Sequence, residues 1–232
     1  MIWSPFFIKS PSDDRFFFCD VFMYYTMGVV LMNLRIKWAA VKVLKKALGL
    51  KKVMGLLSIL SNDQKVGEPW RSVPSPSDQK DIDSRALIGE AILLYRAIQL
   101  KYPAIDAVTI VKDVIRESAI MQLYSLIPKI DKKYFLILPF EEQKASLTKI
   151  VDQFPNADYH IQDVQPNRFA YRITRCRLVE LVNQLGLPEL RDAFCPGDGL
   201  YFERYQPDVL FERPCTIGYG KKYCDFIFSF KE

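Results

Sequence analysis

The stretch YHIQDVQPNRFAYRITRCRLVELVNQLG, residues 159–186, contains the change of structure that defines the fold. Residues 159–164 and 168–174 have strand character, and Pro166-Asn167 between them is typical of a turn. Residues 177–185 return to helical spacing, and Gly186 is placed to end that helix, because glycine adopts the left-handed conformation at little cost. This stretch therefore predicts a strand, a turn, a second strand and a helix.

The chain before this stretch is predominantly helical. Apolar residues recur at helical spacing over 84–101, where Asp83 or Ser84 is placed to cap the helix, and again over 107–126. The apolar run 134–140 has strand character, and helical spacing resumes over 141–153.

After Gly186, two more strands are predicted over 208–217 and 223–230, joined around residues 218–222. Helices thus come first and strands follow. This order predicts an α+β fold with N-terminal helices and a small antiparallel sheet covered by helices.

The first 32 residues differ in composition from the rest. Residues 16–32 are almost wholly apolar, but the run is short for a membrane span and contains Asp20. Three explanations for residues 1–31 remain open: an upstream extension ahead of a true start at Met32, a weak membrane anchor, or an ordinary packed helix. Asp13 and Asp14 argue against a secretory signal.

Residues 33–60 carry seven basic side chains and no acidic one, whereas the rest of the chain is close to neutral. Their apolar residues recur at helical spacing, which predicts a basic amphipathic helix over 32–60, broken near Gly49. Such a helix either lies on an anionic membrane or docks on its own domain with a solvated lysine face. Residues 61–82 are rich in proline and serine and predict a linker, which leaves 83–232 as the α+β domain.

Composition excludes several classes of function. The chain has 232 residues, 50% of them hydrophobic, with a net charge of +5 and one histidine. Because the basic residues are concentrated locally, a nucleic-acid partner is not expected. A single histidine, His160, excludes sites that need two. The five cysteines are odd in number and lack CxxC spacing, which indicates reduced thiols and a cytoplasmic, or membrane-associated, location.

Three groups of chemically capable residues lie between 171 and 228. The first is Thr174-Arg175-Cys176, where a strand meets a helix, so that the helix amides and Arg175 should favour the thiolate of Cys176. The second is Glu189 followed by Cys195 and Asp198, in a region that proline and glycine mark as a loop. The third lies around the last hairpin and contains Arg213, Thr216, Cys224 and Asp225.

Two alternatives to catalysis are open for these groups. The cysteines can be ordinary buried side chains, Arg213 a partner of a carboxylate on the sheet, and Asp198 a capping residue. A metal site formed by Cys176, Cys195 and Cys224 also stays open, although their spacing matches no known ligand pattern. No cofactor is otherwise expected.

The order of these motifs resembles the L-2-amino-thiazoline-4-carboxylic acid hydrolase family, most closely over residues 168–230. The resemblance is carried by Thr174-Arg175-Cys176, by the run from Leu185 to Leu190, by Cys195-x-x-Asp198, by Arg213-x-x-Thr216, and by Gly220-x-x-x-Cys224-Asp225-Phe226-x-Phe228. The last hairpin is also similar to the end of vinyl-reductase-like ligand-binding domains. Cys215 and the basic Lys221-Lys222 pair depart from the family pattern.

The resemblance implies a hydrolase acting on non-peptide C–N bonds, which opens an aminothiazoline carboxylate to an N-carbamoyl-cysteine type product. Either a thiolate of Cys176 or Cys195 attacks the ring, or Asp198 or Glu189 activates water. Arg213 or Arg175 would bind the substrate carboxylate, with Thr216, Cys224 and Asp225 completing the site. The alternatives are a non-catalytic small-ligand-binding domain and a membrane-associated scaffold.

Overall fold

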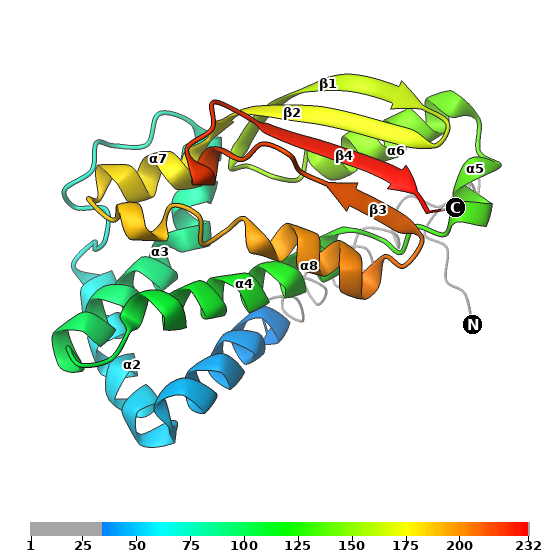
Figure 1. The fold of residues 1–232 in the computed structure, drawn as a ribbon. Helices are drawn as coiled ribbons and strands as arrows, with labels where there is room; N and C mark the ends of the chain where they lie inside the picture. The colour runs from blue at the N-terminus through cyan, green and yellow to red at the C-terminus, as the bar shows by residue number, and fades with distance from the viewer. Residues whose placement is uncertain (1–33, 232) are drawn as a thin grey trace, which may run out of the picture.

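The computed structural model describes residues 34–231, and it begins with helices (Figure 1). Residues 34–48 form one helix, and α2 (Leu50–Lys65) follows it directly. Gly49 separates the two with a φ of 78°, a left-handed conformation in which a glycine costs little. The break predicted near Gly49 is therefore confirmed, but helix continues into the segment that was predicted to be linker.

The long helices α3 (Gln79–Lys101) and α4 (Ala107–Leu126) form the centre of the helical part. Asp78 caps α3 by accepting a hydrogen bond from the Asp81 amide, and Asp106 caps α4 through the Thr109 amide. α4 matches its predicted bounds, whereas α3 begins one turn before the predicted cap at Asp83 or Ser84. The irregular connection is correspondingly shorter, over residues 66–78.

The predicted strand over 134–140 is wrong. The segment instead contains a short helix, α5 (Lys132–Leu136), and the beginning of α6 (Phe140–Val151). The Asp131 side chain accepts hydrogen bonds from the amides of Lys133 and Tyr134, which satisfies the first turn of α5. The segment takes part in none of the strand pairings of the sheet, so its strand character is not satisfied by a ladder.

Four strands form an antiparallel sheet in the order β1-β2-β4-β3. They are β1 (Ala157–Gln165), β2 (Arg168–Cys176), β3 (Val209–Glu212) and β4 (Cys224–Phe230). The hairpin at Pro166-Asn167 is confirmed, and β4 pairs beside β2, with Tyr171 opposite Phe226. The predicted α+β class, with N-terminal helices before a small antiparallel sheet, is likewise confirmed.

The segment between β2 and β3 is more helical than predicted. α7 (Arg177–Gln184) is followed by Gly186, which has a φ of 69°, and then by the 3-10 helix η1 (Pro188–Leu190). α8 (Pro196–Tyr205) then occupies the region predicted to be a loop around Cys195 and Asp198. Pro196 is well suited to the first helical position, where no amide hydrogen is needed, so this proline starts a helix.

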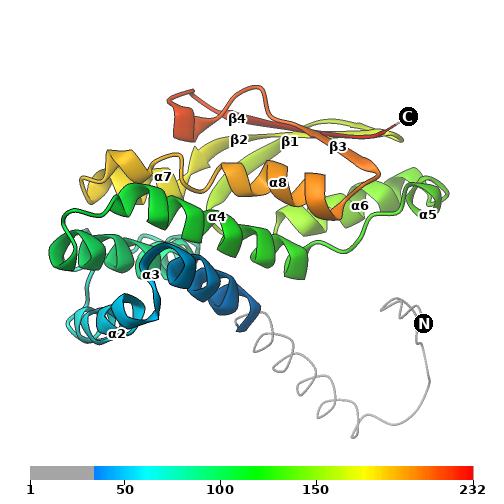
Figure 2. The same cartoon turned by 60° about the horizontal axis from the view of Figure 1, so that its bottom comes forward.

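The helices lie on one side of the sheet and form successive layers (Figure 2). α6 and α8 lie next to the sheet, α3 and α4 below them, and α2 farthest away. The other sheet face is polar, since Arg172 pairs with Asp225 there at 2.6 Å and stacks on the Tyr223 ring.

Residues 1–31 lie outside the described part of the chain. Within residues 34–231, no helix combines the length and apolar character needed to cross a membrane.

Candidate functional site

A cavity of about 720 Å³ lies between the sheet and the helical layers. Its walls come from β2 and β4 above and from α3, α4, α6 and α8 around it, and the helix over residues 34–48 reaches one side. Protein interiors normally contain few voids larger than a water molecule. A space of this size is in the range that holds drug-sized ligands, so it is the candidate site.

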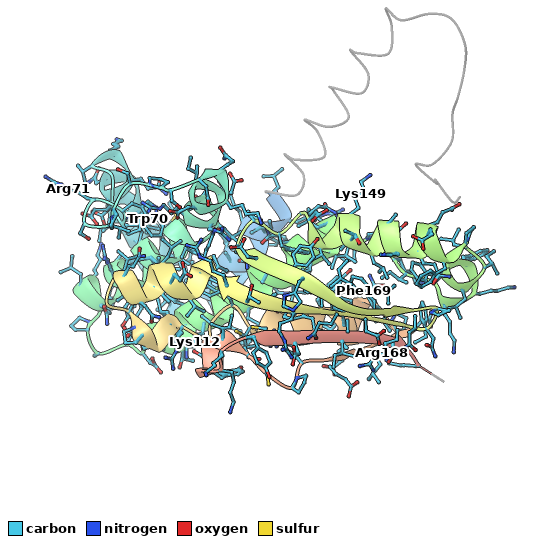
Figure 3. All side chains as sticks on the ribbon, turned by 90° about the horizontal axis from the view of Figure 1, so that it is seen from above. Trp70, Arg71, Lys112, Lys149, Arg168 and Phe169 are labelled. Atoms are coloured by element: carbon cyan, nitrogen blue, oxygen red, sulfur yellow. The ribbon has the colours of Figure 1, made fainter. Side chains whose placement is uncertain are left out.

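The sheet contributes an aromatic wall to this cavity. Inward-facing side chains of β2 and β4 pair across the strands, with Phe169 opposite Phe228 and Tyr171 opposite Phe226. The rings of Tyr171 and Phe226 stack with centroids 5.0 Å apart. Figure 3 views the sheet from above and marks Phe169 beside Arg168 at the beginning of β2. In the sequence, aromatic residues alternate with smaller or aliphatic ones in Phe169-Ala170-Tyr171 and Phe226-Ile227-Phe228, which places the aromatic rings on one face of the sheet. The alternation does not reveal that this face borders a cavity.

Asp198 and Arg213 form an ion pair on the cavity wall. Nη1 of Arg213 lies 2.6 Å from Oδ2 of Asp198, and Nη2 donates a 2.7 Å hydrogen bond to the Cys195 carbonyl. The first turn of α8 positions Asp198, and the chain directly after β3 positions Arg213. Two of the five guanidinium N–H donors are thus used, which leaves the others for a ligand.

The Asp198 carboxyl lies deep among protein atoms, yet 26% of its side chain is accessible. Asp198 lines the cavity, so the enclosed position and the accessible surface are compatible. Loss of hydration raises its pKa from 3.8 to about 6, and Arg213 limits this rise by favouring the charged form. A carboxyl with such a pKa can exchange a proton near neutral pH.

Three cysteines line the same cavity, but their environment keeps them protonated. Burial raises the pKa of the Cys176 thiol to about 11 and that of Cys195 to about 12. Burial also raises the pKa of Cys224, whose sulfur accepts a hydrogen bond from the Ile217 amide. The expected thiolate character of Cys176 at the beginning of α7 is therefore wrong, because desolvation outweighs the helix amides.

Cys195 is held against the 3-10 helix η2 (Ile217–Tyr219) by a close backbone approach. A Cβ atom on Gly218 would lie only 2.6 Å from the sulfur of Cys195 and 3.0 Å from the Arg191 carbonyl oxygen. Glycine is required at this position for that reason. The sequence showed Gly218 as a turn residue only.

Four of the predicted site residues lie elsewhere. Arg175 pairs with Glu180 at 2.8 Å, and Asp225 is on the polar sheet face with Arg172. Glu189 accepts a 2.5 Å hydrogen bond from the Tyr95 hydroxyl, and Thr216 begins η2. None of the four lines the cavity, whereas Cys176, Cys195, Asp198, Arg213 and Cys224 do.

The three cavity cysteines do not form a recognisable metal centre. Within the described residues, no group of three or more histidine, cysteine, aspartate or glutamate side chains is placed to hold a metal ion. Cys19 lies outside these residues. The three-cysteine alternative therefore receives no support from the arrangement of Cys176, Cys195 and Cys224.

The fold and cavity define an α+β protein with a cavity between sheet and helices, whose wall contains the Asp198–Arg213 ion pair. Residues 80–228 match the profile of the L-2-amino-thiazoline-4-carboxylic acid hydrolase family. The match covers more than half of the chain, and the chain belongs to this family. It begins in α3 and ends in β4, so it includes most of the cavity walls.

Other comparisons add little. No curated protein matches the sequence. Among solved structures, a doubly substituted H-NOX protein is 16% identical with a TM-score of 0.31, and the alignment covers 85% of this chain and 94% of that one. A second structure, whose title concerns heme redox potential and porphyrin distortion, has the same identity and score, with coverage of 84% and 92%. Scores of this size do not establish a shared fold.

Proposed function

We propose that the protein is a hydrolase that opens a small cyclic substrate of the aminothiazoline carboxylate kind at the Asp198–Arg213 pair. The observation that carries the proposal is this pair, which lines a cavity whose walls lie largely within the region that matches the hydrolase family. An ionised carboxyl with a raised pKa is suited to removing a proton from water.

The reaction adds water to the amidine-like ring carbon, which lies between nitrogen and sulfur. The water oxygen bonds to this carbon, while one water proton passes through Asp198 to the ring nitrogen. The carbon–sulfur bond then breaks, the remaining hydroxyl proton moves to the sulfur, and a carbamoyl group and a thiol result. No oxidant or reductant is required.

Arg213 has a second role in this proposal. Its unused N–H donors bind the substrate carboxylate, since guanidinium and carboxylate match in geometry. Asp198 also keeps Arg213 oriented through the 2.6 Å contact. The protonated thiols favour activation of water over direct attack by Cys176 or Cys195.

The test is turnover of L-2-amino-thiazoline-4-carboxylate by the full chain, with the carbamoyl product measured by mass spectrometry. Asp198→Asn should lower kcat at least about 100-fold, because general base catalysis contributes this much or more. The wild-type kcat/KM should rise with pH and level off above about 6, since the base must be ionised. This inflection should be absent from the residual activity of Asp198→Asn.

Asp113→Asn is the matched control. Asp113 also pairs with an arginine, Arg116, at 2.8 Å, but it does not line the cavity. The control should keep wild-type turnover. Cys176→Ser and Cys195→Ser should retain most activity, so a complete loss in either would replace the carboxylate route with a thiol nucleophile. Absence of turnover by the wild-type protein would remove this substrate assignment.

A further inference from the structure

The cavity is much larger than the substrate that the family name describes. An aminothiazoline carboxylate is one five-membered ring with two small substituents, whereas the space measures about 720 Å³. Cavities of about 300–1,000 Å³ accommodate drug-sized ligands. A small substrate at Asp198 would therefore leave most of the cavity to be filled by something else.

Polar and apolar groups are separated along the sheet wall. The ion pair, Cys195 and Cys224 gather at one end of β4, where Arg213 lies 5.4 Å from the centre of the Phe226 ring. Farther along β4, the wall continues through Phe228 to Phe230. With about 3.4 Å per residue, Cys224 and Phe230 are separated by about 20 Å along the strand.

The apolar end is aromatic on more than one side. Phe228 contacts Phe169 on the sheet and Phe202 of α8, with the Phe202 ring centre 5.0 Å away. Leu123 of α4 belongs to the same apolar cluster as Phe202 and also lines the cavity. Aromatic walls of this kind favour flat apolar groups through offset stacking and burial.

We propose that the cavity binds an amphiphilic small molecule with a polar amidine-like head at Asp198–Arg213 and a flat aromatic body against Phe169, Phe202 and Phe228. The inference rests on the proposed function for the head group and extends it by assigning the remainder of the substrate. Arg213 donates only to Oδ2 of Asp198, so Oδ1 can accept a hydrogen bond from an amidine head, and the β4 side chains at 226, 228 and 230 that border the body are aromatic.

The test is a binding series in which only the body grows. The dissociation constants of acetamidine, benzamidine and biphenyl-4-carboxamidine are measured by calorimetry with the full chain at pH 8, where Asp198 is ionised. Each added ring should lower Kd at least about tenfold, because it buries one further aromatic surface. Asp198→Asn should weaken all three amidines by a similar factor.

Two substitutions separate cavity binding from adhesion to the surface. Leu123→Trp fills the aromatic end and should remove the gain between benzamidine and the biphenyl compound, while acetamidine binds as before. Leu210→Trp is the matched control, because Leu210 is 43% exposed on β3 and does not line the cavity. Melting curves check that both variants are folded.

If Leu123→Trp fails to fold, Ile150→Phe takes its place, since Ile150 of α6 also lines the cavity. Displacement of anilinonaphthalene sulfonate from the wild-type protein gives the same ranking without any variant. The inference is overturned if the three amidines bind with equal affinity. It is also overturned if Leu123→Trp leaves the gain in affinity from benzamidine to the biphenyl compound unchanged. Turnover of the small substrate without a gain along the series would leave the proposed function standing alone. Tight binding of the biphenyl compound without turnover of the small substrate would support the binding inference and remove the proposed hydrolase function.

Discussion

Asp158 and Asp198 have the same side chain and opposite pKa shifts. A hydrogen bond from Arg177 lowers the pKa of Asp158, with further help from Lys80, although partial burial opposes the shift. Burial dominates at Asp198 and raises its pKa to about 6. The first carboxyl is thus suited to holding structure, and the second to exchanging a proton.

Asp158→Ala should lower the free energy of unfolding by about 1.5 kcal/mol, because it removes a hydrogen bond between charged groups that solvent weakens only in part, Asp158 being 39% exposed. The Arg177 side chain is only 5% exposed and lies 2.8 Å from Asp158, so it would lose its nearest partner. The folded-state pKa of Asp158 is lowered, so this contribution is fully present above the unfolded pKa of 3.8, declines below it, and is lost as the pH falls through the folded-state pKa. Urea unfolding at pH 7 and pH 3 measures both effects.

Asp163→Ala is the control for this prediction. Asp163 pairs with Arg168 at 3.2 Å, but Arg168 is 41% exposed whereas Arg177 is 5% exposed, and pairs between exposed partners contribute at most about 1 kcal/mol. An equal loss of stability in the two variants, or a loss in Asp158→Ala that is no smaller at pH 3 than at pH 7, would contradict the role given to Arg177.

At the scale of elements, the helix over residues 34–48 docks with only part of its apolar surface. Leu44 and Leu48 are buried against α2, α3 and α4, whereas Leu34 and Trp38 are 58% and 67% exposed. Lys42, a basic residue, lies on the exposed side with them. Docking on the domain and binding to an anionic membrane are therefore compatible, since a docked helix can still present a basic, partly apolar face.

This face should bind anionic membranes in a salt-sensitive way, because lysines attract acidic headgroups and Trp38 is suited to the interface. Co-sedimentation with vesicles containing phosphatidylserine should be strong at low salt and fall several-fold at high salt. Trp38→Ala should weaken it, whereas Tyr134→Ala, at another exposed aromatic residue, should not. Failure to bind these vesicles at low salt, or equal binding to neutral vesicles, would leave docking as the helix's only role.

At the scale of the whole molecule, three apolar clusters hold the layers together. The largest joins the helix over 34–48 with α2, α3, α4 and α7. The second joins α4, α8 and β3, and the third joins α6 to the sheet. The cavity lies where α4, α6, α8 and the sheet meet, so the helix layer and the sheet contribute to one site.

A chain beginning at Met32 should therefore fold as a cooperative unit. The described residues 34–231 already form three apolar clusters that connect the helices to the sheet. Circular dichroism and urea unfolding should give a single transition with a midpoint close to that of the full chain. A molten or insoluble product would show that residues 1–31 contribute to the core.

Local features could be predicted from the amino-acid sequence alone. They include the α+β order of elements, the hairpin at Pro166-Asn167, the helix over 107–126 and the helix ends set by Gly49 and Gly186. These depend on spacing, turn residues and caps within a few neighbouring residues. Local signals failed at 134–140, where strand character has no pairing partner, and at Pro196, where a proline begins a helix. The composition of the site depends on tertiary packing, because burial is produced by residues that are distant in the chain. The packing of α8 and the sheet puts Asp198 beside Arg213, gathers three cysteines at one cavity and sends Arg175, Glu189, Thr216 and Asp225 elsewhere. Packing also raises the pKa of the Cys176 thiol, although a helix N-terminus would be expected to lower it. The reason is that desolvation depends on the surrounding atoms and not on the neighbouring sequence.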